Sequence, residues 1–179
     1  ILIASARAGN VIGGGDWAAD RLIPDIMRAA SKDEKVKIRN PHATRPRQHV
    51  LEPLSGYLLL GQKLLEGRRE FAEAWNFGTA EQDNLSVGEI VEHIREMWPR
   101  IDYEIHQSPS QPHEAGLLRL DCSKARIQLK WFPVWTGKET IEKTVEWYRA
   151  FYESGKVQSI YHLNCYIESA KSKNIAWAE

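Results

Sequence analysis

Two segments in the first third of the chain carry residue types that could bind an anionic ligand. The first, residues 7–21, runs from an apolar stretch through Gly13-Gly14-Gly15 to Arg21. Glycine lets a backbone approach a ligand closely or adopt a positive φ, and ligands bind beyond the carboxyl ends of strands in open α/β sheets. The glycines are not followed by the Lys-Ser/Thr pair of a P-loop, and their context is not that of a dinucleotide fingerprint. A ligand-contacting loop and a simple tight turn therefore both remain open.

The second segment, residues 39–49, is basic and contains two prolines, Pro41 and Pro46. Arg39, Arg45 and Arg47 lie within it, together with two histidines. A guanidinium group can hold a phosphate through two parallel hydrogen bonds, and proline lowers the entropy lost when a loop becomes ordered. The pattern favours anion binding, such as that of a diphosphate, over a merely solvated basic loop.

A third, weaker signal is His113 beside Glu114 in a predicted loop. Such a pair can act as a general acid or base, or contact a sugar, although a lone His-Glu pair is more often structural. No further ligand falls at metal-binding spacing, so we predict no metal site. No Gly-x-Ser-x-Gly motif or convincing Ser/His/Asp set occurs either, so we assign no catalytic residue to this chain.

Strands and helices alternate along the chain, which predicts an α/β or α+β class. Apolar runs between turn signals predict strands over residues 1–8, 36–39, 45–50, 74–78 and 103–106. Helical periodicity predicts helices over residues 22–30, 52–65, 86–98, 123–129 and 136–152. Capping boxes open two of these helices, at Ser86 with Glu89 and at Thr136 with Glu139.

Three of these elements carry more specific expectations. Residues 1–8 read as a buried strand. In the helix over 52–65, one apolar stripe is predicted to face the core: Leu54, Tyr57, Leu58, Gly61, Leu64 and Leu65. From Ser154 onward the periodicity is weak, which predicts a loose helix or a partly mobile tail.

Composition excludes several classes of protein. Lys+Arg and Asp+Glu are balanced at 24 each, so the basic excess of a nucleic-acid-binding protein is missing. No apolar run approaches the roughly 20 residues that span a bilayer. Cys122 and Cys165 are too few and too far apart for a zinc site. They fit two reduced thiols in a cytoplasmic protein.

Several longer stretches carry a family resemblance. They are RAGNVIGGGDW (7–17), DRLIPDI (20–26), IRNP (38–41), RPRQHVLEPLSGYLLL (45–60), WNFG (75–78), SVGEIV (86–91) and HEAGLLRLDCSKA (113–125). Together they resemble the C-terminal half of extended short-chain dehydrogenases/reductases that act on nucleotide sugars. The likeness is closest to the branch that dehydrates CDP-glucose. Other branches usually have Tyr-Gly-Pro where this chain has Ile12-Gly13-Gly14, and Arg-Asp where it has Arg45-Pro46.

The resemblance implies a division of the chain and a role for matching residues. Residues 1–20 would be a late strand and loop of the NAD-binding Rossmann sheet, residues 21–152 the smaller α/β substrate-binding domain, and residues 153–179 a C-terminal tail. Arg7 and Ala8 would lie near the nicotinamide end of NAD. The residues that would contact the nucleotide sugar are Asn10, Arg21, Leu22, Ile38, Arg45, His113 and Glu114, with Arg45 clamping the diphosphate and Ile38 flanking the base.

The resemblance also implies an activity for the complete enzyme. Such enzymes convert CDP-glucose to CDP-4-keto-6-deoxy-glucose with an internally recycled NAD, on the way to deoxysugars of surface polysaccharides such as the lipopolysaccharide O-antigen. A cytoplasmic homodimer is implied as well. We expect the isolated chain to be inactive. Two alternatives remain: epimerisation or decarboxylation of another nucleotide sugar by the same fold, and a non-catalytic nucleotide-binding or structural fragment.

Overall fold

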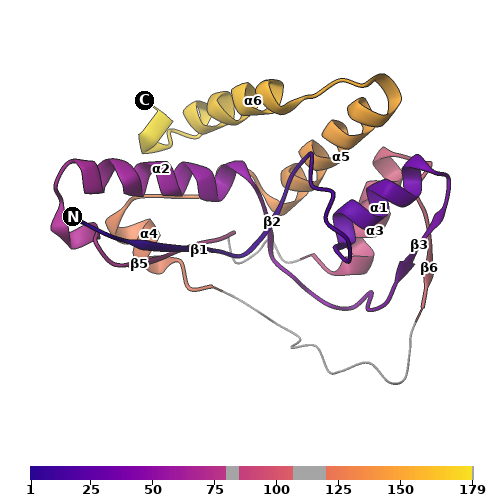
Figure 1. The fold of residues 1–179 in the computed structure, drawn as a ribbon, viewed down its shortest axis with the longest axis horizontal. Helices are drawn as coiled ribbons and strands as arrows, with labels where there is room; N and C mark the ends of the chain where they lie inside the picture. The colour runs from indigo at the N-terminus through magenta and orange to yellow at the C-terminus, as the bar shows by residue number, and fades with distance from the viewer. Residues whose placement is uncertain (80–84, 107–119, 179) are drawn as a thin grey trace.

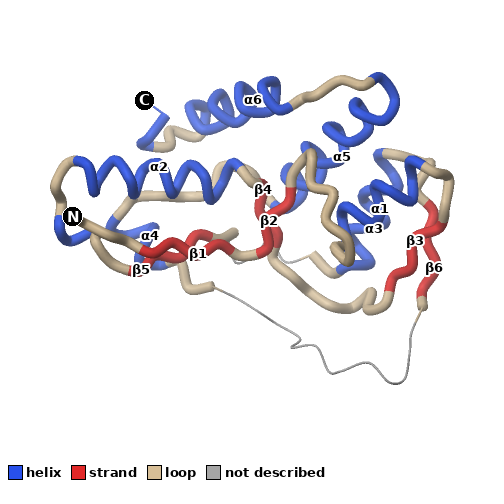
Figure 2. Tube along the Cα trace, viewed as in Figure 1, coloured by secondary structure: helices blue, strands red, loops and turns tan. Residues whose placement is uncertain are grey.

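Three short pairs of parallel strands form the framework in the computed structural model, which describes residues 1–79, 85–106 and 120–178 (Figures 1 and 2). The pairs are β1 (Ser5–Ala8) with β5 (Ala74–Phe77), β2 (Asn10–Ile12) with β4 (Arg47–His49), and β3 (Lys35–Ile38) with β6 (Asp102–Ile105). The strands alternate with helices, so the predicted α/β class is confirmed. All five predicted strands are present, and four of them lie within one or two residues of the predicted bounds.

At one end of the molecule, α2 (Leu51–Leu65) and α4 (Ser123–Gln128) flank the β1–β5 pair (Figure 1). Trp75 and Phe77 of β5 are buried there with Trp131. Gly56 of α2 is needed for this contact, since a Cβ at that position would lie 2.3 Å from the Phe77 ring. The short 3-10 helix Arg69–Phe71 closes the connection from α2 to β5.

At the other end, the β3–β6 pair packs with α1 (Leu22–Ser31), α3 (Val87–Met97) and α5 (Gly137–Ser154). Both predicted capping boxes are confirmed: the side chains of Ser86 and Thr136 each accept a hydrogen bond from the backbone of the glutamate three residues later. The middle pair, β2–β4, lies between the two ends, against α5 and α2 (Figure 2).

The predicted orientation of α2 is wrong. Its buried residues are Glu52, Pro53, Gly56 and Leu60. Leu58 and Leu65 of the predicted core stripe are 75% and 91% exposed, and Leu54 is exposed too. The face of α2 toward the core is set by the buried carboxylate of Glu52 and by Gly56, which leaves room for the Phe77 ring. Neither residue contributes to an apolar periodicity.

The N-terminal strand is shorter and more exposed than predicted. Only Ser5–Ala8 is strand, and its residues are mostly exposed, as are Ile1 and Ile3 before it. β1 pairs with β5 in a two-stranded sheet, so its other edge carries no partner strand among the described residues. The expectation of a buried strand over residues 1–8 is therefore wrong for this chain, because an apolar run is buried only where a second layer covers it.

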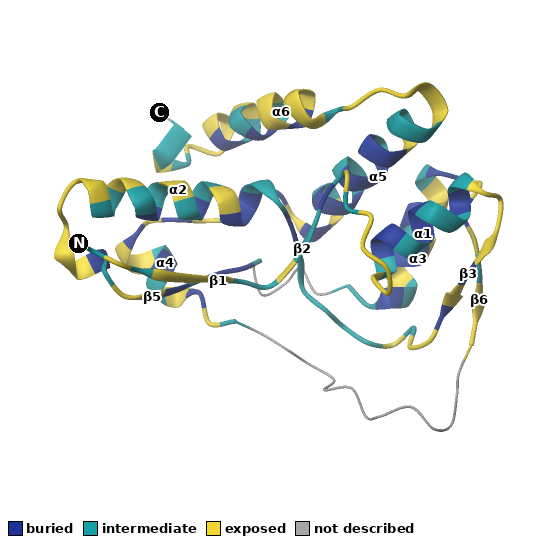
Figure 3. Ribbon diagram, in the orientation of Figure 1, coloured by how far each residue is buried: buried dark blue, intermediate teal, exposed yellow. Residues whose placement is uncertain are grey.

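The segment after Ser154 is better ordered than predicted. It forms α6 (Ser159–Ser172) and a last 3-10 turn, Ala176–Ala178, and α6 runs back along α2 (Figures 1 and 3). Tyr166 and Ala170 are buried against Val134 and Trp135. The helix is amphipathic only over this narrow seam, which is why its sequence periodicity is weak.

The glycine-rich loop is built for packing. A Cβ on Gly14 would lie 2.0 Å from the indole ring of Trp147 on α5, and Gly15 has a φ of +82°. Of the two interpretations left open by the sequence, the described contacts support a tight turn that lets the indole approach the backbone.

A buried polar seam joins β4 to α5 and α6. His49 and His162 are 3% and 2% exposed, and their rings lie 6.3 Å apart. The His49 Nε2 has no hydrogen-bond partner among the described residues, whereas the His162 Nε2 lies 3.5 Å from the Glu146 carboxylate. The pKa of His49 is lowered to about 3, chiefly by burial and then by the positive charges of His162 and Lys143. Burial also lowers the pKa of His162, although the negative charge of Glu146 opposes that shift.

We expect Gly14→Ala to lower the free energy of unfolding by about 1–3 kcal/mol, the usual cost of overpacking a filled site. Gly61→Ala in α2 is the matched control, because nothing lies within 4 Å of its Cβ position. It should raise the free energy of unfolding by about 0.5–1 kcal/mol through helix propensity. Urea unfolding of both variants measures the difference. Equal stabilities would contradict the packing role of Gly14.

His49 should make the fold sensitive to acid. Its pKa is lower in the folded than in the unfolded chain, so its stabilisation is present above about pH 6.5 and is lost as the pH falls toward 3. Between pH 7 and pH 5 we expect it to remove about 2 kcal/mol of stability. Urea unfolding at both pH values should show this loss in the wild type and a smaller loss in His49→Gln or His162→Gln.

The exposed His42 provides the control for this pH dependence. His42→Gln should leave the acid sensitivity of the wild type unchanged. If the His49 and His162 variants both keep the wild-type loss, the buried seam is not its source.

Candidate functional site

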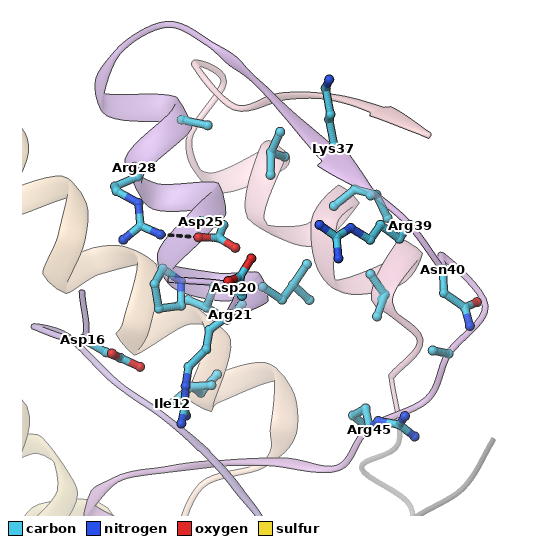
Figure 4. A pocket seen from close by; sticks show the side chains of 18 of the residues that line it. Ile12, Asp16, Asp20, Arg21, Asp25, Arg28, Lys37, Arg39, Asn40 and Arg45 are labelled. Atoms are coloured by element: carbon cyan, nitrogen blue, oxygen red, sulfur yellow. Dashed lines mark hydrogen bonds and ion pairs between the residues drawn. The ribbon is translucent and has the colours of Figure 1, made fainter. Parts of the chain in front are cut away.

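A cavity of about 950 Å³ lies where β2, the loop before α1, β3 and the basic segment meet (Figure 4). Its volume is in the range of pockets that hold a ligand of nucleotide size. The wall is mixed: apolar side chains such as Ile12, Ile23 and Val87 alternate with arginines, lysines and aspartates. A ligand with both an apolar face and negative charge fits such a lining best.

Five of the predicted site residues line this one cavity, although they come from four parts of the chain. They are Asn10, Arg21, Leu22, Ile38 and Arg45. Asn10 belongs to β2, Arg21 and Leu22 open α1, and Ile38 ends β3. The structure thus brings together residues up to 35 positions apart, as a shared ligand requires.

The other predicted residues do not join them. Arg7 and Ala8 lie on β1, beside Asn76 and Phe77 of β5, and do not line the cavity. His113 and Glu114 lie outside the described residues.

The N-terminus of α1 opens onto the cavity with its first amides uncapped by any side chain. Arg21 is the N-cap residue, in an extended conformation, and its side chain makes no capping hydrogen bond. Pro24 in the first turn has no N–H to satisfy. The remaining first-turn N–H groups and the helix dipole favour an anion at this point.

Arg45 and Arg47 of the basic segment also line the cavity. Arg47 pairs in register with Asn10 in the parallel β2–β4 pair, so their side chains lie on the same face of that pair. The pKa of Arg47 is lowered to about 10, first by burial and then by the charge of Arg45. Its Nη1 donates a 3.1 Å hydrogen bond to the backbone oxygen of Arg45. Two guanidinium groups are therefore held close together despite their mutual repulsion.

The cavity's cations differ in whether a carboxylate balances them. Lys35 and Lys37 lie 3.1 and 3.9 Å from Asp102 and Glu104, and Arg28 pairs with Asp25. Within the described ranges, no ion pair is formed by Arg21, Arg39 or Arg47. Arg21 and Arg39 are exposed, whereas Arg47 is partly buried. Cations without a paired carboxylate leave a positive field that an anionic ligand can neutralise.

Sequence reasoning did not assign several residues that line the cavity: Asp16, Asp20, Arg39, Asn40, Arg47 and His106. Arg39, Asn40 and Arg47 belong to the basic segment, and strand alternation around Arg45 could have singled out Arg47. Asp16 and Asp20 supply hydrogen-bond acceptors beside Arg21 (Figure 4). No sequence signal separates them from ordinary turn aspartates.

The sequence contains one Tyr-x-x-x-Lys spacing, Tyr152 to Lys156. Gly155, with a φ of +67°, ends α5 between the two residues. The Tyr152 ring stacks on Trp98 in the aromatic cluster of α5, and neither residue lines the cavity. This pair therefore cannot act on a ligand bound there.

The described residues contain no His, Cys, Asp and Glu grouping suited to a metal ion. Within the same ranges, no helix is both long and apolar enough to cross a membrane.

In sequence, the chain is 49% identical over 149 residues to CDP-glucose 4,6-dehydratase of Salmonella typhimurium. The match covers 83% of this chain and 42% of that protein, so the chain spans less than half the length of this relative. No protein-family model matches the chain.

In structure, the chain is similar to UDP-glucose-4-epimerase of Stenotrophomonas maltophila, with a TM-score of 0.71, 20% identity, and coverage of 86% of this chain and 49% of that one. For dTDP-glucose 4,6-dehydratase of Bacillus anthracis, solved with NAD, the TM-score is 0.67 at 20% identity, covering 84% and 45%. For UDP-glucuronic acid 4-epimerase of Bacillus cereus, solved with UDP-glucuronic acid and NAD, it is 0.68 at 19%, covering 85% and 46%.

These likenesses share one fold across epimerases and dehydratases, and the sequence match adds homology to a dehydratase. The predicted fold, part of an extended short-chain dehydrogenase/reductase, is thereby confirmed. The chain is thus homologous over 149 residues to a CDP-glucose 4,6-dehydratase and has the fold of nucleotide-sugar epimerases and dehydratases.

Proposed function

We propose that the cavity binds a CDP-sugar and that this chain supplies the sugar-nucleotide-binding part of an NAD-dependent CDP-glucose 4,6-dehydratase. The observation that carries the proposal is the convergence of an uncapped helix N-terminus with Arg21, Asn10 and Arg47 on one cavity. The 49% identity to a CDP-glucose 4,6-dehydratase supports the choice of substrate among nucleotide sugars.

The diphosphate would lie between the α1 N-terminus and the arginines of the basic segment. Backbone N–H groups of the first turn would donate to one phosphate. Arg45 and Arg47 would donate to the other, with bidentate geometry available to a guanidinium. Asn10, beside Arg47 in the strand register, would contact the diphosphate or the adjoining sugar.

The nucleoside and sugar ends of the ligand would use the remaining walls. Ile38 and Leu22 offer apolar surface against which a base can pack. Asp16 and Asp20 offer acceptors for sugar hydroxyls. His113 and Glu114 remain predicted contacts from the far loop.

Among the described residues, we assign the contact with NAD to β1 and not to the glycine-rich loop. The Trp147 indole lies directly beside Gly14 and Gly15, which accounts for these glycines without a cofactor contact. Arg7 and Ala8 lie at the carboxyl end of β1, where open α/β sheets bind ligands, and we place them near the nicotinamide. When bound, NAD supplies reversible hydride exchange with the sugar, so that dehydration needs no external oxidant. The role of the residues in this chain is to bind and orient the nucleotide sugar for that exchange.

In the cell, such an enzyme would be a cytoplasmic homodimer that feeds deoxysugars into surface polysaccharides such as the O-antigen. A UDP-sugar epimerase with the same fold is the alternative, because the UDP-glucuronic acid 4-epimerase of Bacillus cereus binds UDP-glucuronic acid and NAD. Base selectivity distinguishes the two.

Calorimetric titration of the chain with CDP, UDP and GDP tests the proposal. We expect CDP to bind about tenfold or more tightly than UDP and GDP, as a site with hydrogen bonds to one base can achieve. Tighter binding of UDP would favour the epimerase alternative. If none of the three binds, the titration is repeated on the chain extended to the length of its relative. Failure there too would overturn the proposal.

Arg47→Gln should weaken CDP binding about tenfold to a hundredfold, since a hydrogen bond to a charged group contributes about 1.5–3 kcal/mol. Cytidine, which lacks phosphates, should bind the variant and the wild type equally. Lys37→Gln is the matched control, because Lys37 also lines the cavity but faces Glu104 at 3.9 Å. Equal losses in both variants would indicate a diffuse charge effect and contradict a specific contact from Arg47.

A further inference from the structure

The residues that open the cavity toward α1 lie on one loop, residues 13–21, which we call the pocket loop. It carries Asp16 and Asp20 of the cavity lining and ends at Arg21, the N-cap residue of α1. The position of this loop therefore fixes both the arginine side chain and the helix end assigned to the diphosphate. What holds the pocket loop in place comes from the other end of the sequence.

Tyr148 of α5 binds the backbone of the pocket loop through both functions of its hydroxyl. The oxygen accepts a 3.0 Å hydrogen bond from the Asp16 N–H, and the hydroxyl donates a 2.5 Å hydrogen bond to the Asp16 carbonyl. The two residues are 132 positions apart. Tyr148 is 0% exposed, so water does not compete for these bonds.

Other contacts fix the same loop from both sides. The Trp17 ring packs edge-on against Tyr148 at 5.4 Å between centroids. Arg28 of α1 donates a 2.8 Å hydrogen bond to the Trp17 carbonyl. Asp20 has a φ of +59°, a strained conformation for a residue with a side chain, and it turns the chain into α1. The neighbouring contacts hold the loop in this conformation.

We propose that Tyr148 is a positioning residue for the nucleotide site. Its hydroxyl holds the pocket loop, and the pocket loop in turn positions Arg21 and the N-terminus of α1. This inference rests on the proposed function. A loop that is already ordered loses less entropy when its ligand binds, so the hydroxyl contributes to affinity without touching the ligand. Tyr148 does not line the cavity.

Tyr148→Phe keeps the buried ring and removes only the hydroxyl. We expect it to weaken CDP binding about threefold to tenfold. Tyr152→Phe is the control: its ring stacks on Tyr148 in the same cluster, and its hydroxyl makes no hydrogen bond within the described part of the chain. Thermal unfolding of both variants separates a loss of folded protein from a loss of affinity in the folded protein.

A double-mutant cycle tests the route of the effect. In an Arg21→Ala background, Tyr148→Phe should cost clearly less affinity than in the wild type, because the group that the loop positions is gone. Equal losses in the two backgrounds, or no loss in either, would overturn the inference.

Hydrogen exchange by mass spectrometry tests, without any ligand, whether the Tyr148 hydroxyl holds the pocket loop. Tyr148→Phe should accelerate amide exchange in residues 16–21 and leave α3 unchanged, whereas Tyr152→Phe should change neither. If the wild type binds no nucleotide but Tyr148→Phe accelerates exchange as expected, the proposed function fails, whereas the hold of Tyr148 on the pocket loop is confirmed. If nucleotides bind but Tyr148→Phe leaves exchange in the pocket loop unaltered, the positioning role of Tyr148 is contradicted and the proposed function is not affected.

Discussion

The carboxylate of Glu52 joins three parts of the molecule that the rest of the structure builds on. It is fully buried in α2 and accepts hydrogen bonds from the N–H groups of Val134 and Trp135 and from the Tyr166 hydroxyl, at 2.7–2.9 Å. Burial raises its pKa, while these three donors and the charge of Lys173 oppose that rise. A buried carboxylate is tolerated only when its acceptors are satisfied. The bonds therefore fix α2, the segment that enters α5, and α6 relative to one another.

α5 connects the segment held by Glu52 to the wall of the ligand cavity. It begins at the Thr136 capping box, directly after the residues held by Glu52, and its 18 residues extend roughly 27 Å. Thr140 and Thr144 are buried near its start, and Trp147 and Tyr148 meet the glycine-rich loop farther along. The cavity wall at Asp16 and Arg21 is thus positioned by a helix that contributes no side chain to the cavity lining. This division between a rigid support and a ligand-contacting loop is common at binding sites.

Local sequence signals predicted the elements well and their environment less well. The capping boxes at Ser86 and Thr136 located two helices because the signal and the interaction involve the same few residues. The buried face of α2 could not be read from its leucines, because Gly56 and Glu52 choose that face through Phe77 and Trp135, far away in the sequence. The glycine-rich loop suggested a ligand contact. In the structure, the close approach of the Trp147 indole explains why residue 14 is a glycine. Five predicted site residues do line one cavity. Arg47 escaped assignment because its burial depends on β2.

A crystal structure of the chain with CDP bound tests the proposed binding site most directly. We expect the two phosphorus atoms to lie between the first turn of α1 and the guanidinium groups of Arg45 and Arg47, with the Asp16–Tyr148 hydrogen bonds intact and the base beside Ile38. A diphosphate bound elsewhere, with this cavity left to solvent, would contradict it.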